Sequence, residues 1–182
     1  MTYSLNLISR FATTAVMAVS IIGGTIPEAK AGGSNYQDHI TLGNTIRSTG
    51  INFKINPARC WDKNSFGWYW AAQNEMVICQ ENKRSVGVEA QWTEEDLDTL
   101  RHEAQHLIQD CMDGTRQGAL DSVYKNPIKL AKDVLGDAGI RSVINAYSEV
   151  SDHIKVMELE AFSVARMNKP LAQSGDIKHY CF

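Results

Sequence analysis

Residues 32–182 contain no apolar run long enough to span a bilayer, so we expect no stable membrane anchor in this part of the chain. They also lack clusters of basic residues, and the formal net charge of the whole chain is only −3. A mildly acidic chain without basic patches argues against nucleic acid or an anionic membrane surface as a partner. Internal repeats and low-complexity segments are absent as well.

The first 31 residues have the three parts of a secretory signal. Arg10 provides the positive start, residues 11–26 are apolar, and Ala29-Lys30-Ala31 is a typical cleavage site. A transmembrane anchor is the alternative, but this apolar run is short for a bilayer and is interrupted by Thr, Ser and Gly. We therefore expect a secreted or periplasmic protein in which residues 32–182 form one domain with one core.

Cysteines are few, and no two of them have the close spacing of a structural zinc site, which argues against a zinc ion bound by cysteine. An even number of cysteines in an exported chain predicts two disulfides, for which three pairings are possible. We favour Cys60 with Cys79 and Cys111 with Cys181. The first pair would staple a hairpin region, and the second would fix the C-terminal end of the chain.

Residues 102–106 read His-Glu-Ala-Gln-His, an HExxH motif. On a helix, positions i and i+4 lie on one face, so His102 and His106 can bind the same zinc ion. A zinc ion lowers to about 7 the pKa of the water molecule bound to it. Glu103 can then accept the proton of this water as general base. The alternative is an exposed helix with two surface histidines.

The surroundings of the motif favour a helix over residues 94–112. Thr93 is a good N-cap residue, and Asp96 stands where a capping box needs its acceptor. Apolar residues then recur at helical spacing, and Asp113-Gly114 provides the stop signal.

The rest of the chain predicts a mixture of helices and strands. Residues 51–55 alternate like a strand, and Gln73-Asn74 separates two β-prone segments that we interpret as a hairpin. The aromatic run in this region is either the core of the sheet or a substrate platform, and the core is the more frequent case. Two further helices are expected, one with Tyr36, Ile40, Gly43 and Ile46 on one face and ended by Gly50, and a long one over roughly 141–167.

A catalytic zinc needs a third protein ligand. The metzincin extension of HExxH requires glycine and histidine where this chain has Gln109 and Met112, so the third ligand must lie further along. Glu158 and Glu160 are two carboxylates in an otherwise apolar helical segment. They lie about 200° apart around a helix, so both cannot face one zinc ion.

Glu158-Leu159-Glu160-Ala161-Phe162 resembles the E-x-x-A-[D/N/F] motif of the glutamate zincins, in which HExxH on one helix is followed by a glutamate ligand on a second helix. The resemblance implies Glu158 as the ligand, with Glu160 in reserve; a solvated helix charge is the other interpretation of Glu158. Phe162 stands where the general pattern has an aspartate that orients the metal site.

With its signal and its cysteine-bearing hairpin before HExxH, the chain looks like a small secreted bacterial zinc metallopeptidase of this gluzincin-like type. The resemblance implies an α+β, zincin-like fold, in which an active-site helix and a ligand helix pack on a small mixed or antiparallel sheet.

Three residues are candidates for supporting roles. Asp110, four residues after His106, can accept the second ring N–H of that ligand, or it is a surface carboxylate. Tyr147 and His153 fall on the expected ligand helix, where either can donate a hydrogen bond to an oxyanion, although a structural role is more common.

We therefore expect a zinc peptidase with one zinc ion per chain, bound by His102, His106 and Glu158, acting on a peptide or protein substrate. Hydrolysis of another amide, such as a cell-wall peptide crosslink, would use the same residues. The alternative from another class is a secreted, disulfide-stapled binding protein with a structural or vestigial metal site. The missing aspartate and the small size of the chain motivate this alternative.

Overall fold

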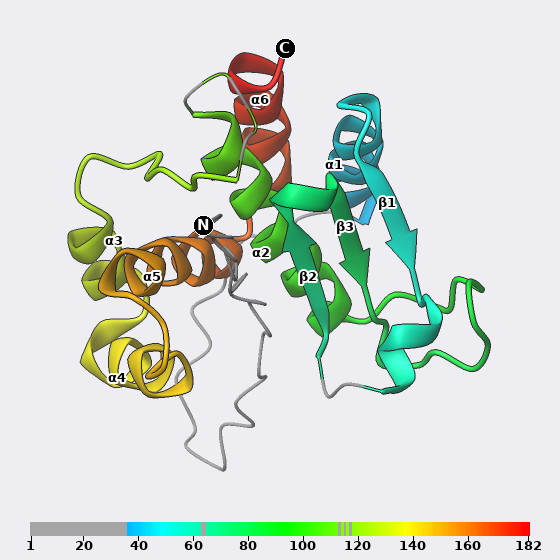
Figure 1. Ribbon diagram of the computed structural model, residues 1–182, viewed down its shortest axis with the longest axis horizontal. Helices are drawn as coiled ribbons and strands as arrows, with labels where there is room; N and C mark the ends of the chain where they lie inside the picture. The colour runs from blue at the N-terminus through cyan, green and yellow to red at the C-terminus, as the bar shows by residue number, and fades with distance from the viewer. Residues whose placement is uncertain (1–35, 63–64, 113, 115, 117) are drawn as a thin grey trace, which may run out of the picture.

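The computed structural model describes residues 36–62, 65–112, 114, 116 and 118–182. The expected signal peptide, residues 1–31, lies outside these ranges. The described residues form six α-helices and one three-stranded mixed sheet, so the α+β class is confirmed (Figure 1). None of the helices in the described ranges is long and apolar enough to cross a membrane.

The sheet contains β1 (Asn52–Ile55), β2 (Gly67–Trp70) and β3 (Glu75–Ile78) in the order β1-β3-β2. β2 and β3 form the expected antiparallel hairpin, and β1 pairs with β3 in parallel. The hairpin turns at Asn74, which adopts the left-handed conformation that asparagine tolerates well.

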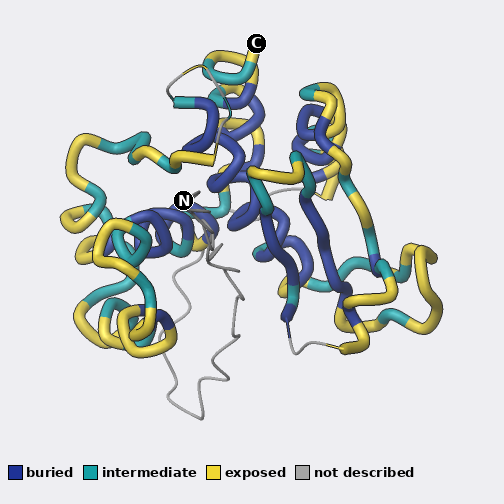
Figure 2. The backbone as a smooth tube through the Cα atoms, viewed as in Figure 1, coloured by how far each residue is buried: buried dark blue, intermediate teal, exposed yellow. Residues whose placement is uncertain are grey.

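The sheet lies on one side of the molecule and α3, α4 and α5 on the other, with α2, which carries HExxH, between them (Figure 1). It packs against β2 on one side and against α5 on another, and it also contacts α6 and α1. Figure 2 shows it buried along most of its length. The six helices are α1 (Tyr36–Ser48), α2 (Glu94–Cys111), α3 (Pro127–Val134), α4 (Gly136–Ala146), α5 (Asp152–Met167) and α6 (Pro170–Tyr180).

The main core lies between the sheet, α1, α2 and α6. Its fully buried side chains include Leu42, Ile46, Met76, Ile78, Leu107, Ile108 and Ile177. Trp68 belongs to a second cluster around one disulfide, while Tyr69 belongs to the main core. Most of the aromatic run therefore serves as core, although Trp61 remains 45% exposed.

Both disulfides have the expected pairing. Cys60–Cys79 joins a short 3₁₀ helix (Ala58–Trp61) to the end of β3. Cys111–Cys181 joins the last residue of α2 to the end of α6. The C-terminal ends of these two helices are therefore covalently linked.

Two expectations about the helices were wrong. The helix expected over 141–167 is two helices, because the chain leaves α4 at Tyr147 and starts α5 after Ser151, whose hydroxyl accepts the N–H of Ile154 at 3.3 Å. The expected apolar face of α1 was wrong in part, since Gly43 and Ile46 are buried but Tyr36 and Ile40 are 49% and 38% exposed. The buried face of α1 instead consists of His39, Leu42, Gly43, Thr45 and Ile46.

Candidate metal centre

Helix α2, which carries the HExxH motif, is fixed at both ends. At its start, Thr93 and Asp96 form the expected capping box, in which the Thr93 hydroxyl accepts the N–H of Asp96 at 3.2 Å and Asp96 accepts the N–H of Thr93 at 2.9 Å. Asp96 also accepts the backbone N–H of Glu81 at 2.9 Å, which ties the connection after β3 to the helix. The disulfide holds the other end.

α5 packs against α2 so that Glu158 faces both histidines of the motif. The Nε2 atoms of His102 and His106 are 3.1 Å apart, and they lie 3.3 and 3.5 Å from the two carboxylate oxygens of Glu158. Four ligands at zinc–nitrogen and zinc–oxygen distances of 2.0–2.1 Å in a tetrahedron would be about 3.3 Å apart. The 3.3 and 3.5 Å distances involve different oxygens of Glu158, and one ligand atom from each of the three residues lies within 4.8 Å of the other two. These three side chains, called here the His-His-Glu cluster, are therefore close enough together to hold one cation.

The chemistry of the cluster also fits a cation. Its side chains are 1–4% exposed, and apart from the two imidazoles the Glu158 oxygens have no hydrogen-bond donor among the described residues. Although burial opposes both shifts, the ionic interaction with His106 holds the pKa of Glu158 far below its usual range, and Glu158 raises the pKa of His106 to about 9. A buried carboxylate without donors is costly unless a positive charge lies beside it.

Glu103 lies beside the cluster on the side of β2. It is 1% exposed, and its carboxylate has no hydrogen bond to the described residues; the backbone N–H of Tyr69 interacts with it only weakly. Burial raises the pKa of Glu103, although the two imidazoles oppose this shift. A raised pKa brings a carboxylate closer to the range in which a general base works at neutral pH.

Gly67 allows β2 to approach Glu103 closely. A Cβ atom at this position would lie 2.7 Å from the methyl group of Thr99 and 2.7 Å from the carbonyl oxygen of Val77. It would also lie 3.4 Å from the Cγ atom of Glu103. The sequence offered only a weak signal for this role of Gly67, namely that a glycine stands among the aromatic residues of an expected strand.

Glu160, the reserve ligand, is buried elsewhere. It is fully buried on another face of α5, and its oxygens accept hydrogen bonds from side chains of α2 and from the segment that precedes α3. The donors are the side chains of Gln105, Gln109 and Ser122 and the backbone N–H groups of Val123 and Tyr124. The structure thus brings Glu158, and not Glu160, to the two histidines.

Asp110 does not support His106 as expected. It is 1% exposed and accepts hydrogen bonds from the Tyr69 hydroxyl at 2.5 Å and from the backbone N–H of Gly118 at 2.8 Å. The Nδ1 atom of His106 instead lies 2.8 Å from the Oε1 atom of Gln109. The reason is geometric, because α5 holds the Gln109 side chain beside His106 through hydrogen bonds to Met157 and Glu160, while Asp110 points toward β2.

Of the two oxyanion candidates, only Tyr147 lies near the cluster, although it caps α4 instead of lying on α5. It is 4% exposed, its hydroxyl has no hydrogen-bond partner among the described residues, and burial together with Glu158 raises its pKa. Its ring packs on Phe162, which in turn packs on the ring of His102 with 4.4 Å between the centroids. His153 is exposed and bonds the carbonyl of Leu120 at 2.7 Å, so it lies outside the site.

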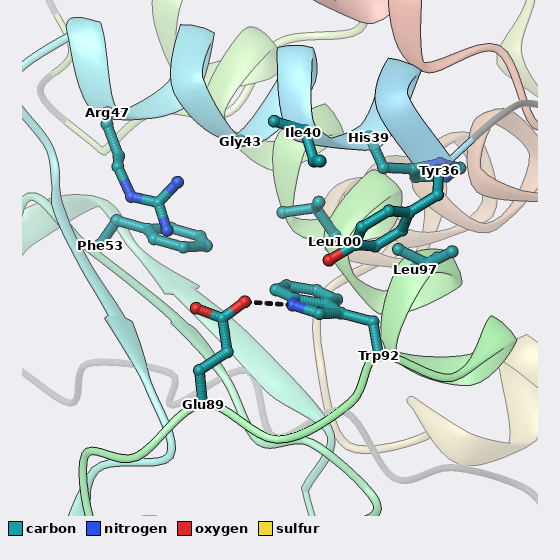
Figure 3. Close-up of a pocket in the computed structure, with 10 residues that line it drawn as sticks. All are labelled: Tyr36, His39, Ile40, Gly43, Arg47, Phe53, Glu89, Trp92, Leu97 and Leu100. Carbon is teal, nitrogen blue, oxygen red and sulfur yellow. Dashed lines mark hydrogen bonds between the residues drawn. The ribbon is translucent and has the colours of Figure 1, made fainter.

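A separate groove of about 230 Å³ lies between α1, the start of α2 and the segment before it (Figure 3). Its two ionised side chains are already engaged, since the Arg47 guanidinium lies 4.5 Å from the ring centroid of Phe53 and Glu89 accepts a hydrogen bond from Trp92. No residue of the His-His-Glu cluster lines it.

Fold and site together define a disulfide-linked α+β domain in which two packed helices bury two histidines and two glutamates at one point. The chain belongs to a family described as a domain of unknown function (DUF8637), which matches residues 35–182. No curated protein and no solved structure matches it.

Proposed function

We propose that this protein is a zinc-dependent peptidase of the glutamate-zincin type that acts outside the cytoplasm. The observation that carries the proposal is the His-His-Glu cluster, whose ligand atoms lie 3.1–3.5 Å apart with the carboxylate of Glu103 buried beside them. Two disulfides support an oxidising compartment, as does the signal-like sequence at the start of the chain.

His102, His106 and Glu158 would hold one zinc ion, since two imidazoles and one carboxylate form a known donor set of catalytic zinc. Bound zinc lowers the pKa of water and polarises a carbonyl group. Glu103 accepts the proton of the attacking water and then donates it to the leaving amine. Tyr147 donates a hydrogen bond to the carbonyl oxygen as negative charge develops there.

The position of β2 supports a peptide as the substrate. β2 is an edge strand, and its pairing with β3 involves Phe66, whose carbonyl accepts the N–H of Cys79 at 2.7 Å. Antiparallel pairing alternates, so the backbone groups of Gly67 and Tyr69 point away from β3. The Gly67 carbonyl accepts a hydrogen bond from the Ser65 hydroxyl at 2.8 Å, and the Tyr69 N–H faces Glu103. An extended peptide can add to such an edge as a further strand and present a peptide bond to the cluster.

The first test is the zinc content of the purified protein, measured by elemental mass spectrometry, followed by a peptide-library screen with the wild type and Glu103→Gln. We expect about one zinc per chain in both proteins. Cleavage should fall by about 10²–10⁴-fold in Glu103→Gln, because the variant cannot accept the proton. A wild type that binds no zinc after reconstitution contradicts the proposal, and so does full activity in zinc-loaded Glu103→Gln.

One observation favours a second function, that of a binding protein with a structural zinc site. Phe162 occupies the place of the orienting aspartate and packs on His102, which closes part of the surroundings of the cluster with an apolar ring. This alternative predicts that a chelator lowers the melting temperature strongly, while no peptide in the library is cleaved at a rate that depends on Glu103.

A further inference from the structure

One buried amide connects His106 to a carboxylate that lies outside the His-His-Glu cluster. The Oε1 atom of Gln109 lies 2.8 Å from Nδ1 of His106, and its Nε2 atom donates to Oε1 of Glu160 at 3.1 Å and to the carbonyl of Met157 at 3.1 Å. Gln109 and Glu160 are both completely buried, so water does not compete for these bonds.

The partners of Gln109 determine which way its amide points. The carbonyl of Met157 and the carboxylate of Glu160 can only accept hydrogen bonds here, so the NH₂ group must face them. The amide oxygen therefore faces His106, and because that oxygen is only an acceptor, Nδ1 of His106 must carry the proton. With a proton fixed on Nδ1, the Nε2 atom, which faces His102 and Glu158, is the one that offers its lone pair to a metal once its own proton has left.

The far end of this connection is itself fixed. Glu160 accepts hydrogen bonds from the backbone N–H groups of Val123 and Tyr124 at 3.1 and 3.2 Å and from the hydroxyl of Ser122. His102 has no comparable support, because its Nδ1 atom is buried without a partner among the described residues and its ring is held by packing on Phe162.

We propose that Gln109 and Glu160 are positioning residues that fix the orientation and the tautomer of His106 for binding the metal through Nε2. This inference rests on the proposed function and adds to it the device that prepares one of the three ligands. Hydrogen bonds of this kind to a metal-binding histidine typically contribute 10–100-fold to metal affinity, so the effect is measurable without any substrate.

The test compares Gln109→Met with Gln105→Met. Gln105 is the matched control, because it is equally buried on the same helix and also donates to Oε1 of Glu160, at 2.9 Å, but has no bond to His106. Methionine has a similar length and cannot form either bond. Zinc affinity is measured by competition with a chromophoric chelator, and the melting temperature of the metal-free proteins reports the cost to the fold.

We expect both variants to lose thermal stability, but only Gln109→Met to bind zinc about 10–100-fold more weakly. Equal zinc affinity in Gln109→Met and the wild type overturns this proposal, and so does an equal loss in both variants; neither result affects the proposed function. A wild type that binds no zinc overturns both.

A second measurement needs no variant. In zinc-loaded wild-type protein, a long-range ¹H–¹⁵N spectrum of the histidine rings should show the proton of His106 on Nδ1, protected from exchange with water. A proton on Nε2 of His106 would overturn the proposal even if Gln109→Met failed to fold.

Discussion

Glu158 and Glu160 lie two residues apart on one helix, and removing the charge of each should have opposite consequences. We expect Glu158→Gln to abolish zinc binding at little cost to the metal-free fold, and Glu160→Gln to destabilise the fold while zinc binding is retained. The structural reason is that Glu158 faces only the two histidine rings, whereas Glu160 faces five hydrogen-bond donors from other residues.

The cost for Glu160→Gln can be worked out from these donors. If the amide nitrogen of the new glutamine takes the place of Oε2, the Ser122 hydroxyl can rotate and accept a hydrogen bond from it. The backbone N–H of Tyr124, however, loses its acceptor, which costs about 1–3 kcal/mol. The three donors to Oε1 then bond a neutral oxygen instead of a charged one, which loses roughly 1 kcal/mol each at most. We therefore expect a loss of about 1–6 kcal/mol in the free energy of unfolding.

For Glu158→Gln, the metal-free protein loses a buried ion pair, but His106 can release the proton that Glu158 induces it to hold. No unpaired charge remains buried, so the free energy of unfolding should change by only about 1 kcal/mol. Zinc affinity should fall by more than about 100-fold, which exceeds the effect of losing a hydrogen bond to a ligand.

Urea unfolding in the presence of a chelator and zinc competition measure the two quantities separately. Zinc binding that survives in Glu158→Gln but is lost in a folded Glu160→Gln protein would refute the assignment of the ligand. Unchanged stability in Glu160→Gln would refute the argument from its donors.

Three further predictions concern other parts of the molecule. Replacing Cys111 and Cys181 by alanine should lower the free energy of unfolding by about 4.4 kcal/mol, since this disulfide closes a loop of 70 residues. The same change at Cys60 and Cys79, which are 19 residues apart, should cost about 3.2 kcal/mol. Equal losses of the two variants in chemical denaturation would show that loop length does not determine the stabilisation. Gly67→Ala should lower the free energy of unfolding by about 1–3 kcal/mol. Adding Thr99→Ser to this variant should restore only part of the loss, because the new methyl group still clashes with the carbonyl of the neighbouring strand. A melting curve like that of the wild type would show that β2 can move away without cost. Tyr147→Phe should keep its zinc and lose about 10²–10³-fold in kcat if its hydroxyl stabilises the oxyanion, and an unchanged kcat would remove it from the mechanism.

Local signals in the sequence predicted much of the centre of the molecule. The capping box at Thr93 and Asp96, the turn at Asn74 and the pairing of the cysteines are each confirmed by the structure. Such features depend on residues close in sequence or on a small number of possible combinations. The spacing of HExxH likewise placed His102 and His106 on one face before any tertiary contact was known.

What failed depended on contacts between distant segments. Val143, Tyr147, Val150 and Ile154 continue one apolar stripe across the break between α4 and α5, so periodicity alone gave a single helix. No apolar stripe in the sequence indicated α6, because this helix buries polar residues such as Gln173. The amide of Gln173 donates to the carbonyl of Arg101 at 2.7 Å.

The choice between the two glutamates of α5 and the role of Gln109 depended on how α5 packs against α2. The position of Gln109, three residues after His106 and on the same helical face, was the one signal available for it.

The packing of α1 against α6 has a consequence for the timing of assembly. Leu42 near the beginning of the domain and Ile177 near its end are buried in the same core, against which α2 packs, and the bond from Cys111 to Cys181 closes the same region. While the chain is being synthesised, α2 therefore lacks one of its supports until residue 181 has emerged. A partly synthesised chain would carry both histidines of the motif on a helix whose packing is incomplete, so the His-His-Glu cluster is fully supported only after synthesis is essentially finished.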